Sequence, residues 1–225
     1  MSLTPLLNTA EIRALFASEL ARSGGSVSDT FDDGQRLFVR SILPRSGDVY
    51  VGETMHSGVA LRSDSHTLHV HPYVFRQLCR NGAIIAHALQ SREIEAEEHT
   101  TKEELAAAIR EAVSACCEKE AFSTAMEEIQ GSRSKVADVA INLLPVLSRL
   151  RPEMGTQIFK MIVERFFDGE DASRFGLMNA VTSVARDTAD PEVRWHLEEL
   201  GGGIPVGRPP APEPEDLAAE AAMAN

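Results

Sequence analysis

Residues 36–72 read RLFVRSILPRSGDVYVGETMHSGVALRSDSHTLHVHP, and this stretch decides the fold class. It contains four short runs compatible with β-strands, at 36–44, 48–55, 58–63 and 66–72, separated by Gly, Asp and Ser. Short apolar-rich runs divided by turn-forming residues are typical of neighbouring antiparallel strands. We therefore expect an antiparallel meander of three or four strands in the front half of the chain.

The residues before this stretch have apolar side chains at helical spacing. Residues 9–22 place four apolar side chains on one face, and Asn8 or Thr9 can cap the start, so we expect a short amphipathic helix there. Residues 23–34 gather turn-forming residues. The front half therefore opens with a helix and a turn region.

The segments that follow the meander are predicted less directly. Pro72 suits the first turn of a helix, so residues 72–80 are expected to be a short helix that Asn81-Gly82 ends. Residues 83–99 are compatible with a helix or a strand, and we favour a strand.

From Thr100 onward the apolar period is close to 3.6 residues. Thr101 and Glu104 form a capping pattern for a long helix that should run to about Gly131. Further helices are expected at 133–150, 152–167, 171–187 and 190–200, the last with Gly201–Gly203 beyond its end. The predicted fold class is α+β: an N-terminal helix and antiparallel β-meander followed by a helical C-terminal half.

The expected organisation has three parts. Residues 1–99 form a β-rich, arginine-decorated module, residues 100–204 a helical part packed on it in one domain, and residues 205–225 a disordered tail rich in Pro, Ala and acids. The tail's acids suit docking to a protein partner, and the apolar stripe within 136–147 is expected in the core or at a subunit interface.

Charge is divided unevenly along the chain, whose net charge is −12. Residues 1–92 carry nine arginines, no lysine and eight acids, whereas residues 93–225 carry 13 basic and 26 acidic residues. The net charge argues against binding nucleic acid over the whole surface and leaves the front half as the candidate region.

The sequence has neither a secretory start nor an apolar run approaching the ~18 residues of a membrane span, so a cytoplasmic protein with no membrane partner is expected. Cys79, Cys116 and Cys117 make neither a disulfide framework nor a paired zinc motif. They are interpreted as reduced thiols.

Arginines are the first candidate site. Arg36 and Arg40 would lie on one face of a strand, and Arg76 and Arg80 one turn apart on a helix. Guanidinium groups presented in this way can follow a phosphate backbone, although ion pairing with nearby acids also accounts for them. The candidate nucleic-acid-binding residues are Arg36, Arg40, Arg62, Arg76 and Arg80.

Histidines are the second candidate. His66, His69 and His71 fall in one predicted strand, where His69 and His71 share a face and could present two imidazoles to a divalent transition metal. A solvated polar strand explains the same pattern without a metal. Asp64, Glu53 and His56 could form an acid–base group, but the GxSxG, GxxxxGK[ST], GxGxxG and HExxH motifs are all absent, so no catalytic residue is predicted.

Two motifs carry a family resemblance. Arg76, Cys79, Asn81 and Gly82 match an Arg-x-x-Cys-x-Asn-Gly signature, and Asn179, Ala180 and Thr182 match an Asn-Ala-x-Thr helix. In this order they resemble a bacterial, phage and plasmid family of unknown function. The resemblance implies association with mobile elements and brings no established reaction.

The leading hypothesis is a DNA-associated binding protein of mobile-element type that binds or anneals single-stranded DNA as a homo-oligomer, without a cofactor. The scarcity of aromatic side chains counts against it, because stacking usually supplies ~1–3 kcal/mol per base. The alternatives are a metal-dependent enzyme that uses His66, His69 and His71, and a non-enzymatic structural or host-interaction protein.

Overall fold

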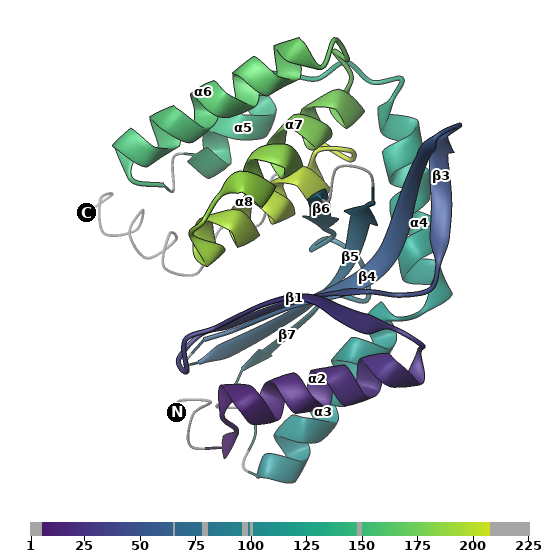
Figure 1. Cartoon of the computed structure of the whole chain (residues 1–225), viewed down its shortest axis with the longest axis vertical. Helices are drawn as coiled ribbons and strands as arrows, with labels where there is room; N and C mark the ends of the chain where they lie inside the picture. Colours follow the sequence, from purple (N-terminus) through teal and green to yellow (C-terminus); the bar gives the residue numbers. More distant parts are fainter. Residues whose placement is uncertain are drawn as a thin grey trace, which may run out of the picture.

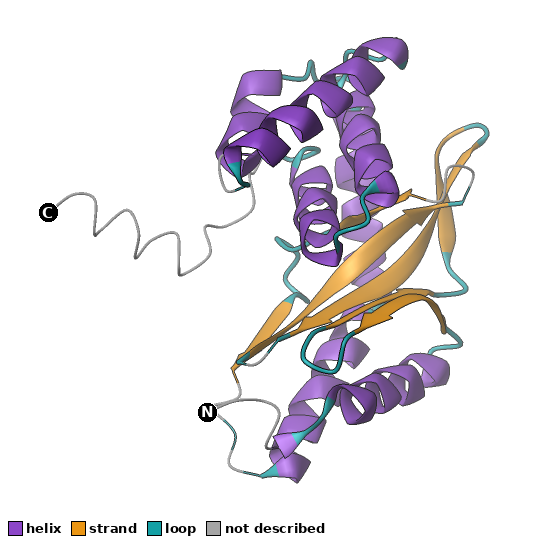
Figure 2. Ribbon diagram, turned by 60° about the vertical axis from the view of Figure 1, so that its left-hand side comes forward, coloured by secondary structure: helices purple, strands orange, loops and turns teal. Residues whose placement is uncertain are grey.

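The computed structural model describes residues 6–64, 66–77, 81–95, 99, 101–147 and 150–207. An N-terminal helix leads into an antiparallel sheet, and a helical C-terminal half follows, which confirms the predicted α+β class. The curved sheet lies between two groups of helices (Figures 1 and 2).

The sheet has seven strands. Its main path runs β1-β2-β4-β5-β6, while β3 pairs with β4 and β7 pairs with β5. The pairs are antiparallel, as expected, but they involve more strands than the predicted meander. The strands are β1 (Ser26–Asp32), β2 (Leu37–Ile42), β3 (Ser46–Tyr50), β4 (Glu53–Ser63), β5 (Thr67–Arg76), β6 (Asn81–Ile84) and β7 (Arg92–Glu95).

Several helices begin where the sequence offers caps. Asn8 and Thr101 each make a capping box, and Pro191 occupies the first turn of the last helix. The helices are α2 (Thr9–Arg22), α3 (Lys102–Cys116), α4 (Lys119–Ser132), α5 (Val139–Leu147), α6 (Pro152–Asp168), α7 (Arg174–Asp187) and α8 (Pro191–Gly203).

One face of the sheet packs on the helix pair α2 and α3. Phe16 of α2 and Ile109 of α3 belong to the same buried cluster as Val39, Leu61 and Val70 of three adjacent strands. Apolar side chains at alternate positions of each strand thus supply this core.

The opposite face packs on α8. Trp195 is fully buried and lies in one cluster with Phe38, Tyr73 and Ile84. Both faces of the central strands are therefore covered, and this places Arg40, Arg62, His69 and His71, which alternate with the first core's residues, under or beside α8.

Two segments of the front half differ from expectation. The predicted turn region contains β1, which pairs with β2 along its length. The helix predicted from Pro72 is wrong, because β5 continues to Arg76. Pro72 stands opposite Val59 of β4, and its carbonyl oxygen accepts a hydrogen bond from Ile85 N–H at 2.9 Å. Pairing on both sides outweighs the local helix signal.

The helical half also differs in three boundaries. The long helix expected up to Gly131 is interrupted between Cys116 and Lys119, and the helix expected at 133–150 is the shorter α5. The glycine run lies inside the last turn of α8 and not beyond it. A Cβ at Gly202 would stand 1.8 Å from the carbonyl oxygen of Ile84, so glycine lets α8 approach β6. Of the predicted tail, residues 208–225 lie outside the described residues.

Candidate functional site

Arg40 lies in a buried ion-pair network. Its side chain is 3% exposed, its Nε lies 2.6 Å from Glu198 Oε2, and a nitrogen lies 3.5 Å from Asp29. Arg194 contacts the same two acids, at 3.1 Å from Glu198 and 2.8 Å from Asp29. The network joins β1 and β2 to α8 and occupies Arg40 with partners from the chain itself.

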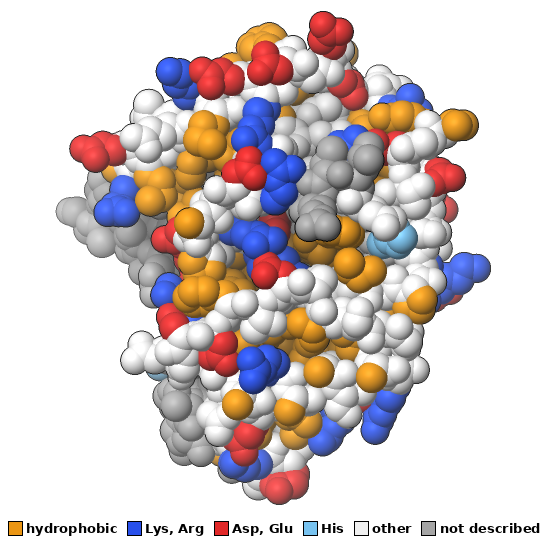
Figure 3. Space-filling view, viewed as in Figure 1, with side chains coloured by type: hydrophobic (Ala, Val, Ile, Leu, Met, Phe, Trp, Pro, Cys, Tyr) orange, Lys and Arg blue, Asp and Glu red, His pale blue; other side chains and the backbone are white. Residues whose placement is uncertain are grey.

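The other predicted arginines also contact acids. The backbone N–H of Arg36 donates to Asp33 Oδ1 at 2.7 Å and its guanidinium to Asp33 Oδ2 at 2.9 Å, and these hydrogen bonds lower the pKa of the Asp33 carboxyl. Arg62 lies 2.7 Å from Glu192, and Arg76 makes two hydrogen bonds to Glu53. Arg80 lies outside the described residues. Figure 3 shows basic side chains over the middle of one face with acidic side chains interspersed among them.

The predicted metal-binding histidines differ in solvent exposure. His66 is exposed at a turn, whereas His71 is 7% exposed, between His69 and Trp195, with ring centroids 5.9 Å from each. Burial lowers the pKa of His71 to about 4, which keeps the imidazole neutral. Among the described residues, no group of three His, Cys, Asp or Glu side chains is arranged to hold a metal ion.

The suggested acid–base residues Glu53, His56 and Asp64 do not form one cluster either. Glu53 begins β4 and pairs with Arg76, while Asp64 follows the other end of this strand. His56 contacts Gln77 at 2.9 Å. The whole length of β4 therefore lies between Glu53 and Asp64.

The structure instead brings together the two sequence motifs. Arg76 and Asn81 stand directly opposite each other in the β5–β6 register. Asn81 Nδ2 donates a hydrogen bond to Thr182 Oγ1 of α7 at 2.7 Å, which brings Asn179 of the same helix over this hairpin. Residues distant in sequence therefore border one space.

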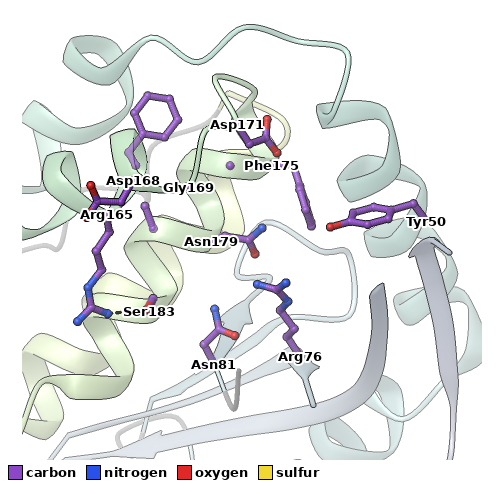
Figure 4. Close-up of a pocket in the computed structure, with 13 residues that line it drawn as sticks. Tyr50, Arg76, Asn81, Arg165, Asp168, Gly169, Asp171, Phe175, Asn179 and Ser183 are labelled. Carbon is purple, nitrogen blue, oxygen red and sulfur yellow. Dashed lines mark hydrogen bonds between the residues drawn. The ribbon is translucent and has the colours of Figure 1, made fainter. Parts of the chain in front are cut away.

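That space is a pocket of about 460 Å³. Figure 4 shows Arg76, Asn81 and Asn179 extending into it, with Tyr50 and Phe175 on one side and Arg165 with Ser183 on the other. Its volume is within the range of small-ligand sites. The lining residues are Tyr50, Arg76, Asn81, Arg165, Phe166, Asp168, Gly169, Asp171, Phe175, Gly176, Asn179, Ala180 and Ser183.

Two amide oxygens in the lining lack a hydrogen-bond partner within the described structure. Both Asn81 Oδ1 and Asn179 Oδ1 are buried and make no such bond. Buried acceptors are nearly always paired in proteins, so such groups mark places where water or a ligand binds.

Cationic side chains border the pocket but are held by acids. Arg165 donates to Ser183 Oγ and, at 2.6 Å, to Asp187 Oδ2. Hydrogen bonds from Arg186 and Arg165 lower the pKa of Asp187 to about 2. Arg76 is likewise paired with Glu53, and Asp168 and Asp171 add two further acids to the lining. The pocket therefore combines hydrogen-bond donors and acceptors without an excess of positive charge.

An aromatic pair forms one wall. The rings of Tyr50 and Phe175 meet edge to face with centroids 6.1 Å apart, and Arg133 lies over the Tyr50 ring at 4.5 Å. Tyr50 is 41% exposed, whereas Phe175 is buried. Tyr50 thus offers an aromatic surface at the rim.

The sequence identified only part of this pocket. Arg76, Asn81 and Asn179 were singled out by the two motifs, but Arg76 was grouped with arginines that lie elsewhere. Tyr50 stood out only as one of the few aromatic side chains of the front half. Arg165, Asp171 and Ser183 had no distinguishing sequence pattern, because isolated polar residues in helices and turns are brought together only by packing.

Comparison of the chain with protein-family models, with curated proteins and with solved structures found no match. The resemblance to the phage and plasmid family therefore rests on the motif residues and stays a prediction. Within the described ranges, none of the helices is long and apolar enough to cross a membrane.

Proposed function

We propose that this protein is a DNA-associated binding protein that holds a nucleotide of a single strand in the pocket between β5, β6, α6 and α7. The observation that carries the proposal is the convergence of Asn81 and Asn179, whose buried amide oxygens face the same lining as Arg76 and Arg165. Amide groups can read base edges, and a nearby guanidinium can contact a phosphate.

The geometry favours binding of a nucleic-acid base in the pocket over arginine contacts along the phosphate backbone. Arg36, Arg40, Arg62 and Arg76 each have an acidic partner, and Arg40 is buried beneath α8. A phosphate would have to compete with these carboxylates for the guanidinium groups. Tyr50 at the rim supplies a stacking surface, a contact that sequence-tolerant single-strand proteins use.

The two sequence motifs bear on the cellular role of the protein. Their resemblance to the phage and plasmid family supports a role with mobile-element DNA in the cytoplasm. Annealing would require several copies to align one strand, so we expect a homo-oligomer whose acidic C-terminal residues contact a protein partner.

A structural or host-interaction role is the second candidate. Several apolar side chains of the α5–α6 region are exposed, among them Val136 at 80%, Ile141 at 64% and Phe167 at 70%. Exposed large apolar side chains can mark a contact with another protein. A protein contact through these residues is compatible with the proposed DNA binding.

The proposal is tested by fluorescence polarisation of a labelled mixed-sequence 20-mer with the full chain. Arg165→Gln should weaken binding about tenfold, a loss of roughly 1.4 kcal/mol. Arg186→Gln is the matched control, because Arg186 also contacts Asp187 but does not line the pocket, and its affinity should stay within about twofold of wild type.

Circular dichroism and urea unfolding of both variants establish that the fold is intact. Absence of wild-type binding at low salt contradicts the proposal. Equal losses in the two variants would mean that net charge, and not the pocket, governs binding.

A further inference from the structure

The hydrogen bonds around Asn81 fix which end of its amide faces the pocket. Thr182 Oγ1 donates its proton to the carbonyl oxygen of Met178 at 2.9 Å. The hydroxyl oxygen is therefore an acceptor toward Asn81, whose NH₂ group must point at it. Asn81 as a whole is 3% exposed, and its amide oxygen remains a buried acceptor without a hydrogen-bond partner in the described structure.

Asn179 presents a second acceptor to the same region. Its Oδ1 is also buried and without a partner, and Asn179 and Asn81 together line a small cavity of about 10 Å³ beside the main pocket. A cavity of that size is just large enough for one water molecule. The two oxygens are therefore either bridged by water or satisfied by a ligand that donates N–H groups.

Other acceptors lie along the lining. Asp168 and Asp171 contribute carboxylates to the main pocket, while Arg76 and Arg165 already donate to Glu53 and Asp187. Beside the two amide oxygens, these acceptors favour a ligand group that donates N–H over a carbonyl oxygen.

We propose that Asn81 and Asn179 make the pocket selective for bases with an exocyclic amino group, an inference that rests on the proposed single-strand binding. Cytosine and adenine present an NH₂ group where thymine and uracil present a carbonyl oxygen. A carbonyl would face the Asn81 oxygen and leave it unpaired, whereas an amino group donates to it.

The test compares two probes of equal charge and similar size. Unlabelled 15-mers of deoxycytidine and of deoxyuridine compete with the labelled 20-mer for wild-type protein at pH 7.5. We expect the deoxycytidine strand to compete about tenfold more strongly, which corresponds to about 1.4 kcal/mol.

Two variants assign the selectivity to Asn179. Asn179→Leu keeps the side-chain size and removes the acceptor, so the preference between the two strands should fall to within twofold in the binding that remains. Asn179→Asp keeps an acceptor in place and should retain the preference even where overall affinity falls. Free deoxycytidine and deoxyuridine, tested as competitors, should show the same order.

The outcomes separate this inference from the function on which it rests. If wild type binds the 20-mer and the two strands compete equally, the amide oxygens are satisfied by water and the selectivity is refuted while single-strand binding stands. If no strand binds, the proposed function itself fails. A preference that survives in Asn179→Leu contradicts the assignment to this residue.

Discussion

Arg40 Nε of β2 donates a hydrogen bond of 2.6 Å to Glu198 Oε2 of α8, and both side chains are almost completely buried. Glu198 also accepts a hydrogen bond from Arg194 at 3.1 Å. This contact fastens the last helix to the sheet through charges that the solvent does not reach. An arginine that would suit phosphate at the surface thus holds the fold together.

Arg40→Met should lower the free energy of unfolding by about 3–5 kcal/mol, because it leaves Glu198 buried with one of its two arginines missing. The double variant Arg40→Met/Glu198→Leu should be less destabilised than Arg40→Met, since the buried charge is removed with its partner. Urea unfolding measures both. Arg36→Met, which breaks the solvent-exposed pair with Asp33, is the control and should cost less than about 1 kcal/mol.

His71 should make stability depend on pH. Burial lowers its pKa from 6.5 to about 4, so between these values the unfolded chain binds a proton that the folded chain does not. The stability that the neutral imidazole contributes is complete above pH 6.5 and is lost as pH falls toward 4, by about 3 kcal/mol at most.

The check is urea unfolding at pH 7.5 and pH 5 of wild type, His71→Leu and His66→Gln. His71→Leu should flatten the dependence in this window, whereas the exposed His66 should leave it unchanged. An identical slope in wild type and His71→Leu would show that other groups dominate the window.

Gly202→Ala should destabilise the protein by about 2–3 kcal/mol, because the added Cβ would stand 1.8 Å from the Ile84 carbonyl oxygen and push α8 off β6. Gly131→Ala is a matched substitution in α4, where a Cβ meets no atom within 4 Å. It should be neutral or stabilising by about 0.5–1 kcal/mol through helix propensity. Thermal unfolding distinguishes the two, and equal effects would contradict the close packing of α8 on β6.

Binding of the 20-mer should depend only weakly on salt. If Arg76 and Arg165 are the guanidinium groups that meet phosphate, the slope of log K against log salt should be about −1.4, since each neutralised phosphate of a single strand adds about −0.7. Polarisation titrations over a NaCl series measure this slope. A value steeper than about −4 would indicate a backbone track elsewhere on the surface and would contradict docking through the pocket.

Local signals in the sequence predicted the local structure well. The helical period, a cap at Asn8 or Thr9, the capping pattern of Thr101 with Glu104 and the proline at the start of α8 are each decided within a few residues. The structure confirms them, with Asn8 as the cap. The short β-compatible runs divided by turn-forming residues likewise predicted antiparallel strands. Segment 72–76 was mispredicted because its strand state depends on partners in β4 and β6.

For the candidate site too, the sequence showed individual residues and the fold decided their contacts. The motifs around Asn81 and Asn179 were visible in the sequence, but their convergence depends on a strand register and on the Asn81–Thr182 hydrogen bond. The arginine pattern was visible too, yet the sequence could not assign Glu198 to Arg40, because that contact joins opposite ends of the chain.

The sequence by itself therefore determined the α+β class, the starts of α2, α3, α6 and α8 and the residues worth testing, since caps and periodicity act over one or two turns. Only the tertiary structure decided which charges are neutralised inside the fold and which amides share a pocket. Long-range packing makes that choice, because burial, and not residue type, sets whether an arginine or an asparagine has a partner within the protein.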